Sequence, residues 1–179
     1  MSAQTTTARI DISAPCGTVR AVVDDEIIRA RGIRYARAER FAPPVDEPAV
    51  DAIDATRPGP ASPQHRIDPN AEFRFDQIGG LATSEDCLRV SVTMPADALT
   101  AEEALPVLVW IHGGAYVSGA GDAEIYDPRA LVTEQRLIVV SVTYRLGVLG
   151  YLGQGRPEHS NLGLLDQISA LRWVQRNIA

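Results

Sequence analysis

Residues 110–116, Trp-Ile-His-Gly-Gly-Ala-Tyr, constrain the fold of this chain more than any other segment. They overlap an apolar run, residues 107–111, which is typical of a buried parallel strand. Small residues directly after such a strand leave backbone N–H groups uncovered, and uncovered N–H groups can stabilise an oxyanion. The pattern therefore predicts a strand whose following residues present uncovered N–H donors to a pocket. A tight turn without a chemical role is the alternative interpretation of Gly113 and Gly114.

Composition places the chain among globular proteins. It has 179 residues, of which 45% are hydrophobic and 22% are charged, so we expect one domain or part of one, with a packed core. The net charge of -6, without long charge runs, argues against nucleic acids and anionic membranes as partners. The first residues show no apolar core of a signal peptide, and no run approaches the roughly 18 apolar residues of a membrane span. We expect a cytoplasmic protein.

The first half of the chain predicts a hairpin followed by irregular structure. Residues 18–23 and 27–33 are typical of strands, and the polar residues between them predict a turn. Residues 1–15 are predicted to form a disordered tail. Residues 41–69 hold seven of the twelve prolines, a density that disfavours regular elements, and residues 64–84 indicate a long surface loop.

The second half predicts α/β architecture. Residues 87–94 alternate between apolar and polar, which indicates a half-exposed strand, and residues 137–142 indicate a buried one. Asp127 and Pro128 predict the start of a short helix between the two buried strands. A final amphipathic helix, with Asn161 as its cap, is predicted from a stripe of Leu164, Ile168, Leu171, Val174 and Ile178.

Four segments together resemble one family in their order and spacing. They are Ser-Glu-Asp-Cys-Leu at 84–88, Ile-His-Gly-Gly-Ala at 111–115, Tyr-Arg-Leu-Gly-Val-Leu-Gly-Tyr-Leu at 144–152, and Asn-Leu-Gly-Leu-Leu-Asp-Gln at 161–167 with Ala-Leu-Arg-Trp-Val at 170–174. The chain resembles the type-B carboxylesterases, which include cholinesterases and bacterial para-nitrobenzyl esterases, over about residues 16–179. The resemblance implies that residues 1–179 form the N-terminal part of a single α/β-hydrolase domain: the hairpin, the first strands of the central sheet and the helix before the nucleophile elbow.

The resemblance also implies a chemistry. The family hydrolyses carboxylic esters through a serine acyl-enzyme and a Ser-Glu-His triad. It places the oxyanion-hole donors at the backbone N–H groups of Gly114 and Ala115, with His112 and Gly113 as supporting loop residues. Many members carry a third glycine where this chain has Ala115. The implied substrate is a small carboxylic ester, and we expect no metal and no cofactor.

The nucleophile is missing from this sequence. No Gly-x-Ser-x-Gly occurs in the 179 residues, so the serine, acid and histidine of the triad are assigned to no residue. We therefore expect an N-terminal fragment of an esterase that is inactive alone. The alternative is a non-catalytic, cholinesterase-like binding module. The sequence predicts neither the particular ester nor the oligomeric state.

Two ion pairs with a structural role follow from the resemblance, Arg40 with Glu85 and Arg145 with Asp166; solvated charges are the alternative. The resemblance also places a cysteine that pairs with Cys87 at the position of Ser62, so Cys87 is expected to lack its usual partner. We expect both Cys16 and Cys87 to be reduced thiols.

Overall fold

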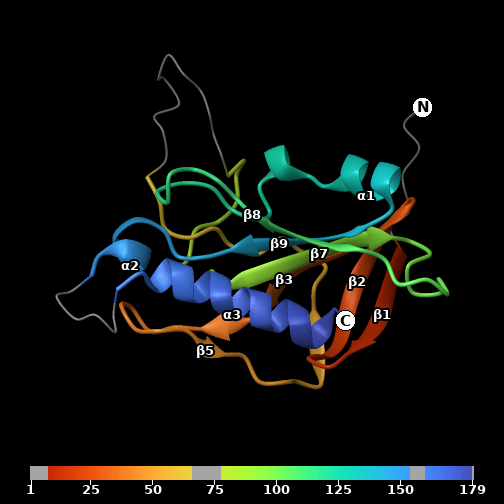
Figure 1. Ribbon diagram of the computed structural model, residues 1–179, viewed down its shortest axis with the longest axis horizontal. Helices are drawn as coiled ribbons and strands as arrows, with labels where there is room; N and C mark the ends of the chain where they lie inside the picture. The colour runs from red at the N-terminus through yellow and green to blue at the C-terminus, as the bar shows by residue number, and fades with distance from the viewer. Residues whose placement is uncertain (1–7, 66–77, 154–159, 179) are drawn as a thin grey trace, which may run out of the picture.

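A mixed β-sheet forms the centre of the computed structural model, which describes residues 8–65, 78–153 and 160–178 (Figure 1). Within these residues seven strands join in the order β1-β2-β3-β7-β9-β8, with β6 paired in parallel to β2. Their bounds are β1 (Ala8–Ala14), β2 (Gly17–Asp24), β3 (Ile27–Arg34), β6 (Ala52–Asp54), β7 (Arg89–Pro95), β8 (Val107–Ile111) and β9 (Ile138–Thr143). The short strands β4 (Ala36–Arg37) and β5 (Val45–Asp46) form a separate antiparallel pair.

Strand direction divides the sheet into two parts. Strands β1, β2, β3, β7 and β9 are antiparallel neighbours, whereas β8 runs parallel to β9 with Val107 opposite Ile138. A parallel pair needs a crossover connection, and α1 (Arg129–Gln135) lies in it. The predicted hairpin is confirmed, since β2 and β3 pair with Asp24 opposite Ile27. A mixed sheet with a parallel strand pair and a crossover helix agrees with the architecture that the resemblance predicts.

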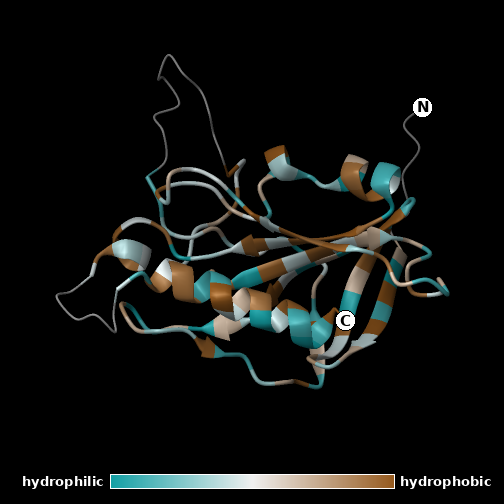
Figure 2. Cartoon of the chain, viewed as in Figure 1, coloured by the Kyte–Doolittle hydropathy of each residue, from teal (hydrophilic) through white to brown (hydrophobic). Residues whose placement is uncertain are grey.

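Helices cover both faces of the sheet (Figures 1 and 2). On one face α3 (Leu162–Asn177) packs Trp173 into the main core, which includes Val90 and Val140. On the other face Val132 of α1 packs against Ile27 and Val139. Neighbouring residues of a strand point to opposite faces, so Val139 and Val140 serve the two cores. The short elements η1 (Glu124–Tyr126) and α2 (Gly147–Tyr151) were not predicted and precede α1 and α3.

The N-terminal tail prediction is wrong for residues 8–15. Residues 8–14 form β1, which pairs with β2 along its whole length. Ile10 and Ile12 of β1 pack against the main core, and this burial holds the strand in place. In its described part, residues 41–65, the proline-rich segment is irregular except for β5 and β6, which are only two and three residues long. Most of the loop predicted for 64–84 lies outside the described residues.

Two strand predictions were wrong about burial. Strand β7 is buried on both faces. Val90 and Val92 lie in the main core, and on the other face the hydroxyl of Ser91 donates to Asp122 at 2.8 Å. Its polar residues therefore do not mark a solvent face. Strand β8, whose apolar run is typical of a buried strand, lies at the edge of the described sheet, with Val107, Trp110 and Ile111 exposed by 38–40%. The resemblance does predict an edge here, because it places β8 beside a nucleophile-bearing strand that these residues do not include.

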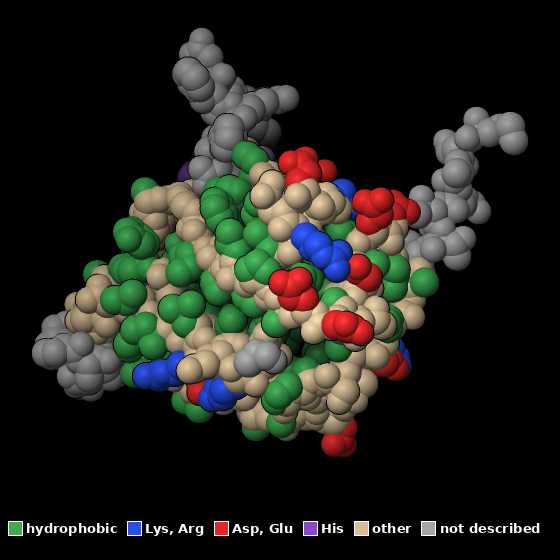
Figure 3. Space-filling view, turned by 45° about the vertical axis from the view of Figure 1, so that its right-hand side comes forward, with side chains coloured by type: hydrophobic (Ala, Val, Ile, Leu, Met, Phe, Trp, Pro, Cys, Tyr) green, Lys and Arg blue, Asp and Glu red, His purple; other side chains and the backbone are tan. Residues whose placement is uncertain are grey.

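The buried face of the final helix differs in part from the predicted stripe, of which Val174 and Ile178 do pack against the main core. Leu164 and Leu171 are exposed, while α3 buries Leu162, Gly163, Asp166, Ser169, Ala170 and Trp173. Asp166 and Ser169 face inward because each has a polar partner there. Asn161 stands at the N-cap position without a side-chain capping bond. Figure 3 shows that hydrophobic side chains cover much of the face in view.

The short helix begins one residue later than predicted. Pro128 is its N-cap residue rather than its first helical residue. Asp127 still supports the helix start, because its carboxylate accepts the N–H of Arg129 at 3.0 Å.

Both ion pairs are formed, in contrasting environments. Arg145 and Asp166 are 4% and 0% exposed, and the guanidinium meets both carboxylate oxygens at 2.7 and 2.8 Å. Arg145 also donates to the carbonyl of Ala42 at 2.7 Å. Burial raises the pKa of Asp166, and Arg145 opposes that rise. The pair between Arg40 and Glu85 is exposed, and its hydrogen bond lowers the pKa of Glu85.

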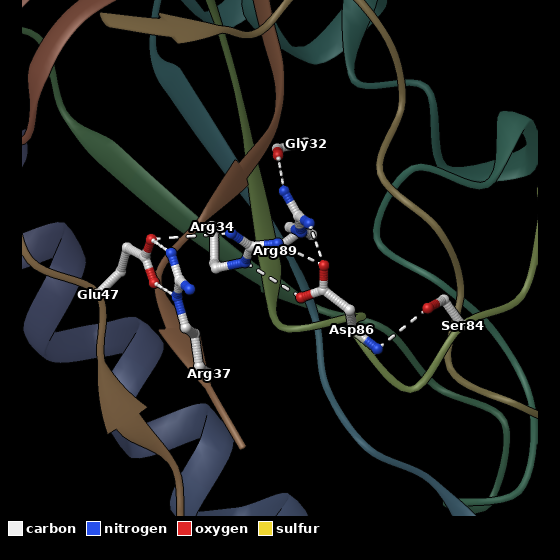
Figure 4. A network of polar contacts seen from close by, with 7 residues as sticks. All are labelled: Gly32, Arg34, Arg37, Glu47, Ser84, Asp86 and Arg89. Atoms are coloured by element: carbon white, nitrogen blue, oxygen red, sulfur yellow. Dashed lines mark hydrogen bonds and ion pairs between the residues drawn. The ribbon is translucent and has the colours of Figure 1, made fainter. Parts of the chain in front are cut away.

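The residue after Glu85 anchors a larger network (Figure 4). Asp86 accepts from Arg34 and from Arg89, and Arg89 also donates to the carbonyl of Gly32 at 3.1 Å. Glu47 binds Arg37 and lies 3.7 Å from Arg34. The network thus joins the end of β3, the start of β7 and the proline-rich segment.

Replacing one member of the buried pair tests its contribution. Asp166→Asn should lower the free energy of unfolding by about 3–5 kcal/mol, because it leaves the Arg145 charge buried without compensation. Urea unfolding followed by circular dichroism measures the change. Glu85→Gln is the control, because its pair is exposed and should leave the midpoint almost unchanged. Equal midpoints for both variants would contradict a structural role for the buried pair.

Candidate active site

The segment after β8 begins with a buried histidine. His112 is 2% exposed, and its ring stacks on Tyr144 with the ring centres 4.6 Å apart. The Tyr144 hydroxyl donates to the carbonyl of His112 at 3.0 Å. Nδ1 of His112 lies 2.8 Å from the carbonyl oxygen of Gly113, which can only accept, so Nδ1 carries the proton. His112 therefore fixes the start of the loop from both its backbone and its ring.

Residues 113–119, which we call the oxyanion loop after the role that the resemblance predicts for it, turn back on themselves. The carbonyl of Gly114 accepts the N–H groups of Val117 and Ser118 at 3.0 and 3.1 Å. Gly114, Ala115 and Tyr116 have φ values of 115°, 52° and 61°. Positive φ is strained for the two residues that are not glycine, at a cost of about 1–3 kcal/mol each, and such strain concentrates at functional sites.

The turn leaves two adjacent N–H groups available. Within the described part of the chain, neither the Gly114 nor the Ala115 N–H donates to a protein acceptor. Ala115 is exposed and Gly114 partly so, which leaves both donors within reach of a ligand. Two neighbouring N–H groups without a protein acceptor can bind an oxygen that carries negative charge.

His112 is held neutral by its surroundings. Burial lowers its pKa, because the charged ring would lose its hydration. Nε2 is buried without a partner among the described residues, so a second proton there would have no acceptor. The ring accordingly acts as a neutral support for the loop.

The structure brings some predicted site residues together and keeps others apart. His112, Gly113, Gly114 and Ala115 form one loop, whereas the two ion pairs serve the framework. Sequence reasoning missed Tyr144, although it begins one of the segments that carry the family resemblance. Tyr144 follows β9 and reaches the loop because β9 runs beside β8.

A cavity of about 580 Å³ lies outside the oxyanion loop. Its walls include Arg31, Ser91 and Asp122, and none of the predicted site residues lines it. Burial raises the pKa of Asp122. Among the described residues no group of three or more His, Cys, Asp or Glu side chains could hold a metal ion. The helices described are all too short or too polar to cross a membrane.

The two cysteines are not joined by a disulfide. Ser62 hydrogen-bonds the Cys87 thiol, and burial raises the pKa of that thiol to about 12. Ser62 is fully buried and also accepts the N–H of Leu146 at 3.1 Å. A hydroxyl therefore occupies the position where the resemblance expects the partner cysteine.

A parallel strand pair with an oxyanion-type loop at its carboxyl end is the arrangement found in α/β-hydrolases. The carboxylesterase family model matches residues 10–179, and the chain belongs to that family. Members of the family are carboxylic ester hydrolases.

Known proteins are similar along nearly the whole chain. It is 46% identical over 173 residues to the Rhodococcus erythropolis protein named "Probable N-octanoylanthranilate hydrolase AqdA2", covering 93% of this chain and 36% of that protein. It is 38% identical to the para-nitrobenzyl esterase of Bacillus subtilis, covering 94% of this chain and 35% of that protein. The solved structure of a thermophilic para-nitrobenzyl esterase matches with a TM-score of 0.81 and 36% identity. The match covers 96% of this chain and 36% of that structure's chain. The chain thus spans about a third of the length of these relatives.

Glycine at position 114 is required by the turn. A Cβ at Gly114 would lie 2.0 Å from the carbonyl oxygen of Ser118, whereas one at Gly113 would meet no atom within 4 Å. Gly114→Ala should therefore destabilise the protein by more than about 1 kcal/mol, and Gly113→Ala by less than about 0.5 kcal/mol. Thermal unfolding of the two variants measures the difference. Equal losses would refute this account of the turn.

The buried His112 makes stability depend on pH. Its folded pKa lies below the ordinary value of 6.5, so the unfolded chain binds the proton first as the pH falls. Stability should decline as the pH falls below 6.5, by at most about 1.4 kcal/mol per pH unit. His112→Gln should flatten this slope, measured by urea unfolding between about pH 5 and pH 7.5. His65→Gln, at an exposed position, should leave the slope as it is; the same slope in all three proteins would exclude His112 as its source.

Proposed function

We propose that the protein to which this chain belongs hydrolyses carboxylic esters through a serine acyl-enzyme, and that this chain supplies its oxyanion hole. The observation that carries the proposal is the pair of available N–H groups at Gly114 and Ala115 in the strained turn after β8. In a tetrahedral intermediate the negative charge develops on the former carbonyl oxygen, and the two N–H groups would donate to it. One such donor is worth about 3–4 kcal/mol of transition-state stabilisation.

Each neighbouring residue has a role in this proposal. His112 and Gly113 support the loop, and the methyl group of Ala115 narrows the space beside the acyl group compared with a third glycine. The ion pairs of Arg145 with Asp166 and Arg40 with Glu85 hold the framework. The substrate class is a small carboxylic ester, and the chemistry calls for no cofactor.

Under this proposal the nucleophile lies outside these 179 residues, because the sequence contains no Gly-x-Ser-x-Gly. The chain order serine, acid, histidine of the family then places the other two triad members after it. We accordingly propose that the 179 residues alone do not turn over esters. An oxyanion hole without a nucleophile has no tetrahedral intermediate to stabilise. The competing function is a binding module that keeps the fold without the chemistry.

The coding sequence beyond the codon for Ala179 provides the first test. The proposal expects a Phe-Gly-Gly-Asp-Pro turn and then Gly-Glu-Ser-Ala-Gly. The protein that includes this continuation should hydrolyse para-nitrophenyl esters, and the 179-residue chain should not exceed the buffer rate. In the active protein Gly114→Ala should lower kcat by about 100-fold, because the displaced turn misplaces one donor, while Gly113→Ala changes it little.

Two results would overturn the proposal. A stop codon with no serine elbow in any frame would favour the binding module, especially if the chain is monomeric and unfolds cooperatively. A continuation that contains the elbow but shows no ester turnover would contradict the chemistry itself.

A further inference from the structure

One side chain from the proline-rich segment binds both backbone groups of the residue that closes the oxyanion loop. The side-chain oxygen of Gln64 accepts the N–H of Gly119 at 2.8 Å, and its Nε2 donates to the carbonyl of Gly119 at 2.9 Å. Nε2 also donates to the carbonyl of Ser62 at 3.0 Å. These three contacts fix which end of the amide carries oxygen, since the reverse orientation would place Nε2 against an N–H group.

Gln64 extends from a firmly held platform. Ala61 and Ser62 are fully buried. The N–H of Ala61 donates to the carbonyl of Ala82 at 2.8 Å, and its carbonyl accepts the N–H of Ser84 at 2.9 Å. The Ser62 hydroxyl accepts the N–H of Leu146. The amide of Gln64 therefore acts on Gly119 from a fixed position.

Gly119 in turn lies directly against the start of the loop. A Cβ at Gly119 would be 2.4 Å from Nδ1 of His112 and 2.8 Å from the carbonyl oxygen of Gly113, and its φ is 109°. No side chain separates these backbones. Holding Gly119 in place therefore restricts the movement of the His112 ring and of the Gly113 carbonyl.

The Gly113 carbonyl belongs to the same peptide unit as the Gly114 N–H. The described residues contain no cis peptide bond, so in this planar trans unit the N–H points opposite to the carbonyl. Fixing the Gly113 oxygen, through His112 on one side and Gly119 on the other, therefore fixes the direction of the Gly114 donor. Rotation of this one unit would replace a donor by a carbonyl oxygen, which repels an oxyanion.

We propose that Gln64 is a positioning residue for the oxyanion hole: its amide clamps Gly119 and thereby keeps the Gly113–Gly114 peptide in the orientation that presents the Gly114 N–H. This inference rests on the proposed function for its catalytic meaning. The clamp itself is a structural claim about this chain that amide measurements test without any turnover.

Amide hydrogen exchange and ¹⁵N chemical shifts of the 179-residue chain provide the test. In Gln64→Leu the Gly119 amide should exchange at least about tenfold faster, and the Gly114 amide should change its shift and exchange rate. Gln64→Glu keeps the size and the acceptor for the Gly119 N–H but loses both donors, so an intermediate effect is expected. If Gln64→Leu does not fold, Gln64→Glu provides the same comparison. Gln135→Leu, at an exposed position of α1, is the control and should leave both amides unchanged.

The outcomes separate the clamp from the enzyme chemistry. Loss of Gly119 protection with an unchanged Gly114 amide would overturn the proposal, because Gln64 would then only anchor its own segment. In an active longer protein, Gln64→Leu should lower kcat by about 10- to 100-fold with KM nearly unchanged, since the donor acts in the transition state. An inactive wild-type protein with the amide changes as expected would refute the proposed function and leave the clamp standing.

Discussion

The buried pair of Arg145 and Asp166 is the interaction on which the rest of this structure depends. Removing two charges from water costs more free energy than their attraction to each other provides. The pair is therefore stable only when its remaining hydrogen bonds are also made. Those bonds come from the Arg145 backbone N–H and from the carbonyl of Ala42. The pair therefore forms only when three parts of the chain come together: the residues after β9, the helix α3 and the proline-rich segment.

The residues on either side of Arg145 extend this junction to the oxyanion loop. Tyr144 donates to the carbonyl of His112, and the Gly147 N–H donates to the carbonyl of Tyr116 at 2.7 Å. The Leu146 N–H donates to Ser62, two residues before Gln64. Consecutive residues thus hold the loop at its start, in its middle and, through the Gln64 segment, at its end. A turn with strained φ values at Ala115 and Tyr116 needs support of this kind to persist.

Sequence patterns predicted the elements better than their burial. The hairpin of β2 and β3 and the strands β8 and β9 followed from apolar runs bounded by polar turns. Alternation misled at β7, because Ser91 is satisfied by Asp122 rather than by water. The helical stripe misled at α3, where Asp166 faces inward and Leu164 outward. A hydropathy pattern cannot show that a distant partner compensates an inward polar group.

The candidate site was likewise only partly predictable from local sequence patterns. The local pattern predicted a strand followed by small residues with uncovered N–H groups, whereas the choice of Gly114 and Ala115 as donors came from the family resemblance. The contributions of Tyr144 and Gln64 depend on segments 32 and 55 residues away from His112 and Gly119, and no local pattern reports such contacts.

The location of the loop in the sheet indicates where the proposed nucleophile would lie. Ligands of α/β sheets bind beyond the carboxyl ends of parallel strands, and the loop follows the carboxyl end of β8 beside its parallel neighbour β9. Among the described residues β8 is the last strand on this side of the sheet, and its Val107, Trp110 and Ile111 are partly exposed. A strand added there in parallel would end next to Gly114 and Ala115. In the proposed enzyme, a nucleophile at the end of such a strand would face the two donors, and the edge of β8 and the oxyanion loop would then act together.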